Sequence, residues 1–214
     1  MCETLEELLE PRSTALVLVD LQNDFVSEGG VVDGRSEGRE AKHRGIVANT
    51  AAVLEAARGC GVAVVHVRYA RTADHRFESA ASLRWTLVKR GYAADAVSAV
   101  EGTWGAEIVA SLAPGADEIV IDKRRASGFF GTPLESVLRA RGIRTVVLAG
   151  VSTHGCVEST ARDAELRDFY VALLQDCVGA YSDALHEAAL VVMASRYEVI
   201  SSRDALRTWA RPAA

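Results

Sequence analysis

Short aliphatic runs alternate along this chain with longer segments of helical apolar spacing, and this alternation restricts the fold more than any other feature. Residues 15–19 are apolar throughout and end at Asp20, which is typical of a strand buried on both faces. Further strands are predicted at residues 62–67, 118–122, 145–149, 170–174 and 197–200, and helices at residues 43–58, 79–90, 104–112, 133–141, 156–167, 182–195 and 203–210. Strands that alternate with such helices form a parallel central sheet with helices on both faces, so we expect a three-layer α/β/α fold.

The composition is that of a folded domain. The chain has 214 residues, of which 49% are hydrophobic and 25% are charged, so we expect one domain over residues 1–214 with a full core. A net charge of -5 argues against nucleic acid or an anionic membrane as partner. The longest apolar runs are too short to cross a bilayer, and the acidic N-terminus lacks the basic region of a signal peptide. We therefore predict a cytoplasmic protein.

The four cysteines show neither a C-x-x-C pair nor a zinc-like Cys/His cluster; they are Cys2, Cys60, Cys156 and Cys177. In a cytoplasmic chain they are expected to be reduced, and the ordinary role of each is that of a small buried hydrophobic residue. The position of Cys156 suggests a different role.

Polar residues follow three of the predicted strands. Asp20 ends the first strand, Lys123 follows the third, and the turn at residues 150–155 leads from the fourth into Cys156. In a parallel sheet these positions share one edge, where ligands bind. At a helix start, backbone N–H groups lower the pKa of a thiol and can stabilise an oxyanion. Singly, the three residues also fit a helix cap, a solvated charge and a buried cysteine, but together they form a plausible set for acyl transfer.

Two other motifs occur in the same segment and are weaker. Gly150 and Gly155 have the spacing of a phosphate-binding loop, but Cys156 stands where such a loop needs lysine. Cys156 and Arg162 have the C-x5-R spacing of cysteine phosphatases, although the residues between them lack glycine and include Glu158. A phosphatase and a non-catalytic binding protein therefore stay open as alternatives.

Three ordered motifs carry a family resemblance. They are Leu-Val-Asp-Leu-Gln-Asn-Asp-Phe at residues 18–25, Lys123 with Ser-Gly-Phe-Phe-Gly-Thr-Pro-Leu at residues 127–134, and Gly-Val-Ser-Thr-His-Gly-Cys-Val-Glu-Ser-Thr-Ala-Arg-Asp at residues 150–163. With their strand contexts they resemble the isochorismatase-like cysteine hydrolases over residues 12–200. The stretch 123–163 is most similar to the ureidoacrylate and N-carbamoyl amidohydrolases within that family.

The resemblance implies a catalytic triad of Cys156, Asp20 and Lys123. In it, Asp20 takes the thiol proton and later gives it to the leaving amine, while Lys123 holds both groups and lowers their pKa values. It also implies a cis peptide between Val151 and Ser152, with the N–H groups of Ser152 and Cys156 as the oxyanion hole. The expected reaction is hydrolysis of a C–N bond in a small linear amide or ureido compound through a thioester, without a cofactor. The family further implies a homo-oligomer, either a dimer or a tetramer.

Two departures from related patterns refine this expectation. Nicotinamidases of the family place an Asp and two His on a metal near the second strand, but residues 66–77 lack the Asp-x-His spacing, so we expect no metal. The narrower group has an aromatic residue where this chain has Ala126, which implies a wider pocket or a different substrate preference. True isochorismatases cleave a vinyl ether and lack the cysteine, so Cys156 favours amide or ureide hydrolysis over ester or vinyl ether cleavage.

Further candidates for substrate binding are weaker, because each also has an ordinary structural role. They are Asn23, Phe25, Trp104, Arg125 and Phe129. Asn23 fits either a hydrogen bond in the site or a turn, and the three aromatic residues fit either a pocket wall or the core. Arg125 fits either a bidentate contact with a substrate carboxylate or a surface charge. We interpret His154 as a solvated turn residue and His66 as a core histidine.

Overall fold

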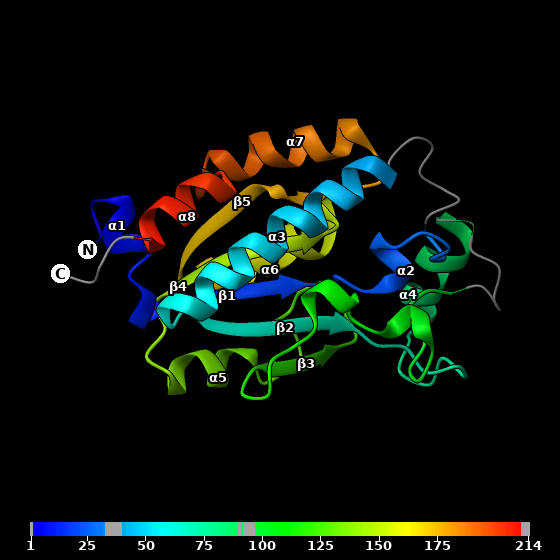
Figure 1. Cartoon of the computed structure of the whole chain (residues 1–214). Helices are drawn as coiled ribbons and strands as arrows, with labels where there is room; N and C mark the ends of the chain where they lie inside the picture. The colour runs from blue at the N-terminus through cyan, green and yellow to red at the C-terminus, as the bar shows by residue number, and fades with distance from the viewer. Residues whose placement is uncertain (1, 33–39, 90, 92–96, 211–214) are drawn as a thin grey trace.

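A computed structural model describes residues 2–32, 40–89, 91 and 97–210. Its centre is a parallel six-stranded sheet with the order β3-β2-β1-β4-β5-β6 (Figure 1). The strands are β1 (Thr14–Val19), β2 (Ala63–Tyr69), β3 (Ile119–Lys123), β4 (Thr145–Val151), β5 (Tyr170–Gly179) and β6 (Glu198–Ile200). The strand order reverses between β1 and β4, and ligands bind at such a reversal in open α/β sheets.

Helices cover both faces of the sheet, which confirms the predicted three-layer fold (Figure 1). One layer contains α1 (Leu5–Leu8), α3 (Glu40–Cys60) and α8 (Ser202–Trp209); the other contains α5 (Leu134–Ala140), α6 (Glu158–Glu165) and α7 (Asp183–Ala194). Successive side chains of β1 enter alternate cores. Leu16 and Leu18 pack toward α3, whereas Ala15 and Val17 pack toward α5 and α6. Both faces of β1 are therefore buried, as its continuous apolar run predicts.

The predicted helix at residues 104–112 is wrong. Two 3-10 turns, Trp104–Ala106 and Ala110–Leu112, flank an extended stretch that pairs with α2 (Asn23–Val26) and the residues before it. The Asn23 N–H donates to Glu107 O at 2.9 Å, and the Val109 N–H donates to Leu21 O at 3.1 Å. The backbone groups that a helix would pair internally are bonded here to a neighbouring segment, so apolar spacing alone wrongly predicted a helix.

Other elements differ in extent from the prediction. α3 continues past Gly59 and ends before Gly61, whose φ of 79° is the left-handed conformation that glycine adopts easily. The predicted helix at 79–90 is a short α4 (Ala80–Leu83) followed by a π-helical turn, Arg84–Lys89. β4 and β5 both extend beyond the predicted ends, with a register shift between Leu148 and Gly150. This shift lies directly before the turn that carries Cys156.

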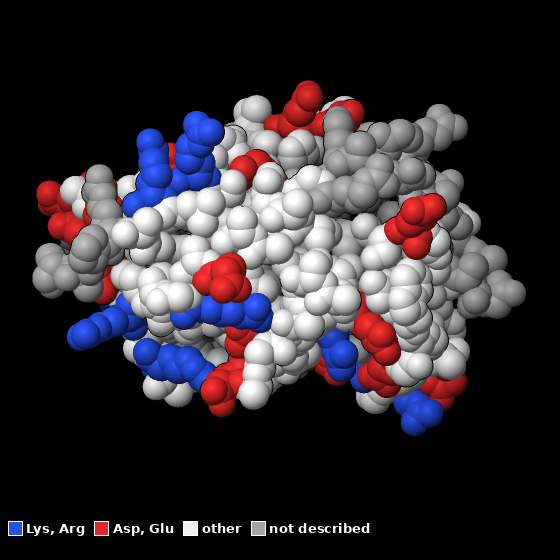
Figure 2. Space-filling model, viewed as in Figure 1, with Lys and Arg blue, Asp and Glu red and all other residues white. Residues whose placement is uncertain are grey.

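Charged side chains of both signs are scattered over the face shown in Figure 2, where basic and acidic groups interrupt one another. Several pair locally, as Arg58 does with Glu118 at 2.7 Å. Among the described residues, no helix is both long enough and apolar enough to cross a bilayer.

Candidate active site

Lys123 lies at the centre of a buried cluster at the carboxyl edge of the sheet. Its Nζ is 2.8 Å from Asp20 Oδ2, 3.2 Å from Cys156 Sγ and 3.2 Å from Arg125 O. An ammonium group has three N–H donors, so these acceptors use all of them. The ring of Tyr69 lies beside the same nitrogen, with its centroid 4.5 Å away. The structure thus brings together the acid, the cation and the thiol that the strand-end argument selected.

Strand alternation explains why Lys123 points inward. In β3 the side chains of Ile121 and Lys123 are buried, and that of Asp122 between them is exposed. Asp122 instead forms an ion pair at the surface with Arg68, 2.5 Å away. A shift of one residue in this strand would exchange the two faces and remove Lys123 from the cluster.

Asp20 follows β1 with an unusual backbone. Its φ of 54° is left-handed, a conformation that Asp and Asn adopt more readily than most residues, and its N–H donates to Val67 O at 2.8 Å. The side chain is buried, and Oδ1 has no hydrogen-bond partner among the described residues. The structure therefore leaves one carboxylate oxygen available inside the site.

The turn that carries Cys156 is a π-helical turn, Thr153–Val157, that leads into α6. The Ser152 carbonyl accepts the N–H groups of Gly155 at 2.9 Å and Val157 at 3.2 Å, and the Val151–Ser152 peptide is cis. Gly150 allows the turn to approach β1, since a Cβ there would lie 1.9 Å from Val19 O. From α7, His186 Nδ1 lies 2.8 Å from Thr153 Oγ1 and ties the turn to that helix.

Burial dominates the electrostatics of the cluster. Burial raises the pKa of Asp20 although Lys123 lowers it, and burial together with Asp20 raises the pKa of the Cys156 thiol to about 12. Burial alone would lower the pKa of Lys123, but Asp20 and Cys156 raise it above the ordinary value. Lys123 lowers the pKa of the Cys156 thiol, as predicted, but burial and Asp20 outweigh it, so the expected low pKa is not reached. The resting thiol is neutral at pH 7 and needs a base to react.

A cavity of about 400 Å³ opens onto Asp20 and Cys156. Aromatic side chains form part of its wall, from Phe25, Tyr69, Trp85 and Tyr181. Ser152 and Ala126 also line it, so the position where the resemblance implies an aromatic residue faces the ligand space. This volume suits a small molecule that could place a carbonyl group next to Cys156.

The other predicted pocket residues lie elsewhere. Asn23 Nδ2 donates to Trp104 O at 2.9 Å and serves the local turn, while the Trp104 side chain is half-exposed away from the cavity. Phe129 is buried in the core beside Phe169, with ring centroids 5.9 Å apart. Arg125 donates to Arg124 O at 2.6 Å and to Phe77 O at 3.1 Å, so its guanidinium binds loop backbone and does not line the cavity. Phe25 is the one of these five that lines it.

Sequence reasoning missed most of the cavity wall. Tyr69, Arg71, Trp85 and Ser98 come from residues 69–98, a stretch without a readable period. His154 lies in the turn, as predicted, but it is half-buried and lines the cavity, 3.5 Å from Tyr181 Oη through Nε2, which the sequence interpretation missed. Its position two residues before Cys156 is the sequence feature that could have predicted His154 in the cavity wall.

The phosphatase alternative finds no support in the geometry. Arg162 donates to Glu158 on α6 at 2.7 Å and does not line the cavity, so the C-x5-R spacing does not provide a phosphate-binding arginine here. Within the described ranges, no group of three or more His, Cys, Asp or Glu side chains could hold a metal ion. His66, the core histidine of the sequence prediction, is buried and contacts Glu118 at 2.9 Å.

Comparison with known proteins gives one consistent result. A family model described as "Isochorismatase domain" matches residues 14–205. The ureidoacrylate amidohydrolase RutB of Agrobacterium fabrum is 38% identical over 176 residues, which cover 78% of this chain and 76% of that protein. The relative of the same name from Variovorax paradoxus is 37% identical over 202 residues, covering 89% of this chain and 76% of the relative.

Solved structures agree with the sequence relatives. A cysteine hydrolase from Pseudomonas syringae pv. phaseolicola superposes with a TM-score of 0.79 at 26% identity, covering 93% of both chains. The N-carbamoylsarcosine amidase of Thermoplasma acidophilum has a TM-score of 0.69 at 29% identity, covering 89% of this chain and 96% of the amidase. The fold and the sequence therefore point to the same group of proteins.

Proposed function

This chain belongs to the isochorismatase family, and from this premise we propose that it is a cysteine-dependent amidohydrolase of small linear amides or ureido compounds. Its relatives are amidohydrolases and amidases, so the chain is a hydrolase that acts on C–N bonds. The main support for the cysteine mechanism is that the ammonium group of Lys123 contacts both Asp20 Oδ2 and Cys156 Sγ, and that the acid and the thiol line the cavity.

In the proposed first half-reaction, Asp20 accepts the thiol proton as Sγ attacks the substrate carbonyl carbon. The raised pKa of Asp20 makes it a stronger base than an exposed carboxylate, and the raised pKa of Cys156 makes this proton transfer necessary. The N–H groups of Ser152 and Cys156 stabilise the resulting oxyanion. Asp20 then protonates the leaving nitrogen, the C–N bond breaks, and ammonia or an amine departs from a thioester.

In the second half-reaction, water attacks the thioester carbonyl. Asp20 takes the proton from water and passes it to the departing sulfur, so that the carboxylate and the thiol are restored as the acid product leaves. Throughout, Lys123 stays charged, because Asp20 and Cys156 raise its pKa. It balances the negative charge that passes between oxygen and sulfur.

The test of this function is turnover of a panel of compounds, measured as ammonia or amine release from primary amides and N-carbamoyl compounds and as release of the alcohol or carbonyl product from esters and vinyl ethers. We expect turnover of at least one amide or ureide, with a covalent acyl adduct of the intact protein detectable by mass spectrometry after rapid acid quench. Turnover of esters or vinyl ethers without any amide or ureide would contradict the proposal. A homo-oligomer in the cytoplasm is part of the same proposal, and light scattering after size exclusion tests the oligomer.

We expect Lys123→Arg to lower kcat by about a hundredfold or more, because a planar guanidinium cannot replace a compact ammonium among three close acceptors. Arg124→Lys is the matched control, because Arg124 is the next residue along the chain and its side chain pairs with Glu101 at the surface. Ammonia release gives kcat, and thermal unfolding checks the fold. Turnover of Lys123→Arg near that of Arg124→Lys would remove Lys123 from the mechanism.

Activity is expected to survive dialysis against EDTA, because the proposed steps use only side chains and water. The measurement is ammonia release before and after dialysis, with a mock-dialysed sample as the control. Loss of activity on chelation, with recovery on adding zinc or iron, would contradict the interpretation of the segment between His66 and His75.

A further inference from the structure

Arg71 is a buried cation that the proposed mechanism does not use. It follows β2 at the carboxyl edge of the sheet, and its backbone pairs with the segment around Val100 through bonds to Ala99 O and from the Glu101 N–H. The side chain is 7% exposed and lines the cavity. A guanidinium keeps its charge in proteins, so its burial at a ligand cavity calls for an explanation.

Other residues hold the Arg71 guanidinium in one orientation. Nε donates to Glu78 Oε1 at 3.0 Å, and Nη1 donates to Ser98 O and Oγ, both at 3.3 Å. Nη2 makes only one hydrogen bond to a described residue, a long contact of 3.5 Å with Thr86 Oγ1. With two N–H donors on Nη2, this edge of the guanidinium retains capacity for an acceptor.

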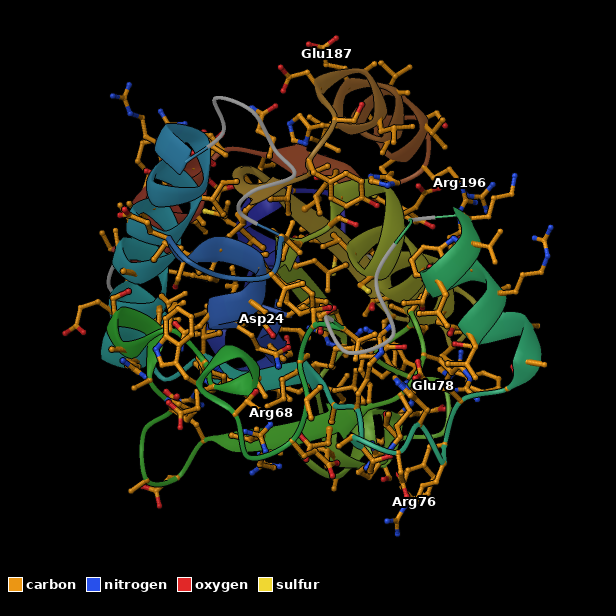
Figure 3. The ribbon with its side chains drawn as sticks, turned by 90° about the vertical axis from the view of Figure 1, so that its right-hand side faces the viewer. Asp24, Arg68, Arg76, Glu78, Glu187 and Arg196 are labelled. Atoms are coloured by element: carbon orange, nitrogen blue, oxygen red, sulfur yellow. The ribbon has the colours of Figure 1, made fainter. Side chains whose placement is uncertain are left out.

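Arg71 lines the cavity, whereas its counter-ion, Glu78, does not. Glu78 is buried, does not line the cavity, and is shared with His75, whose Nδ1 lies 2.6 Å from Oε2. In Figure 3, Glu78 falls inside the outline of the molecule, whereas Arg76, two residues earlier, projects beyond its edge. Lys89 also lines the cavity, so Arg71 and Lys89 give this part of the wall a positive character.

Tyr69 connects Arg71 with the catalytic cluster. The Arg71 Cζ lies 4.6 Å from the Tyr69 ring centroid, and Lys123 Nζ lies 4.5 Å from the same centroid. The two cations are therefore no further apart than the sum of these distances. A short linear molecule whose carbonyl lies at Cys156 can reach Arg71 with its other end.

We propose that Arg71 binds the carboxylate of the substrate, so that the enzyme prefers short acidic ureides or amides over neutral ones of the same shape. The proposal rests on the amidohydrolase function proposed above. It assigns to Arg71 the role that the sequence had suggested for Arg125. Glu78 is then a positioning residue that fixes the guanidinium from the side opposite the ligand.

The experiment compares N-carbamoyl-β-alanine with N-isopentylurea, in which an isopropyl group replaces the carboxylate. Ammonia release gives kcat/KM for the wild type, Arg71→Gln and the matched control Arg76→Gln, whose arginine pairs with Asp74 at the surface. We expect Arg71→Gln to lose about ten- to a hundredfold in kcat/KM for the acid and little for the neutral urea, because one charge-assisted contact is removed. Arg76→Gln should match the wild type on both.

A second variant and a binding measurement make the test independent of folding and turnover. Arg71→Gln/Glu78→Gln removes both charges of the pair and leaves no uncompensated buried carboxylate if the single variant unfolds. Calorimetry of both compounds with Cys156→Ala, with and without Arg71→Gln, measures binding even where neither compound is hydrolysed. Equal losses for acid and neutral compound, or no preference of the Cys156→Ala protein for the acid, would overturn the role of Arg71. Absence of ammonia from both compounds, with acid binding that depends on Arg71, would instead count against the proposed reaction.

Discussion

Cys156→Ala is expected to fold like the wild type and to lose turnover by at least about a thousandfold, because no other described thiol lies in the cavity. The side chain is small and partly buried, so its truncation leaves the turn held by the Ser152 carbonyl and by Thr153. Ammonia release measures the loss, and thermal unfolding by circular dichroism checks the fold. The acyl adduct should disappear from the mass spectrum of the quenched reaction.

The other cysteines supply controls at graded burial. Cys2 and Cys60 are half-buried, and Cys60 Sγ contacts Ala57 O at 3.5 Å within its own helix. Cys2→Ser and Cys60→Ser should therefore keep activity. Cys177 lies in the core, where burial raises its thiol pKa to about 12, so Cys177→Ala should lower stability and spare turnover. Turnover by Cys156→Ala comparable to these variants would contradict the mechanism.

The sequence predicted that Asp20, Lys123 and Cys156 lie close together, because two simple rules determine their positions. Continuous apolar runs mark buried parallel strands, and the ends of such strands share one edge of the sheet. That rule was enough to bring Asp20, Lys123 and Cys156 together. The same rule also selected Arg125, whose side chain binds loop carbonyl groups instead. The rule predicts which residues lie at the edge of the sheet, but it does not predict where each side chain points.

The cavity wall could not be predicted in this way, because tertiary bonds determine the conformation of its segments. Arg71 acquires its role from a bridge to the chain near Val100 and from an ion pair with Glu78, and neither follows a period in the sequence. Trp85 reaches the cavity from a π-helical turn, which is not predictable from apolar spacing. The raised pKa of Cys156 likewise depends on its burial, which the sequence does not show.

Asp20→Asn is expected to lower kcat by about a hundred- to ten-thousandfold, the usual contribution of a general base. The substitution is isosteric, and Asn also tolerates the left-handed backbone that Asp20 adopts at a φ of 54°, so the turn after β1 should not change. What changes is chemistry. A carboxamide does not accept the Cys156 proton, so the thiol loses the base that would deprotonate it during attack.

Stability must be measured beside activity in this variant, because Asn leaves the buried ammonium of Lys123 without its counter-ion. Breaking a buried ion pair costs about 3 to 5 kcal/mol, so a lower midpoint of thermal unfolding is expected. Asp122→Asn is the matched control, since that carboxylate pairs with Arg68 at the surface of the adjacent strand. Raising the pH distinguishes the two causes of lost activity. If only the base is missing, turnover by folded Asp20→Asn should rise as the thiol ionises, whereas pH-independent turnover near the wild-type rate would show that Asp20 is not the base.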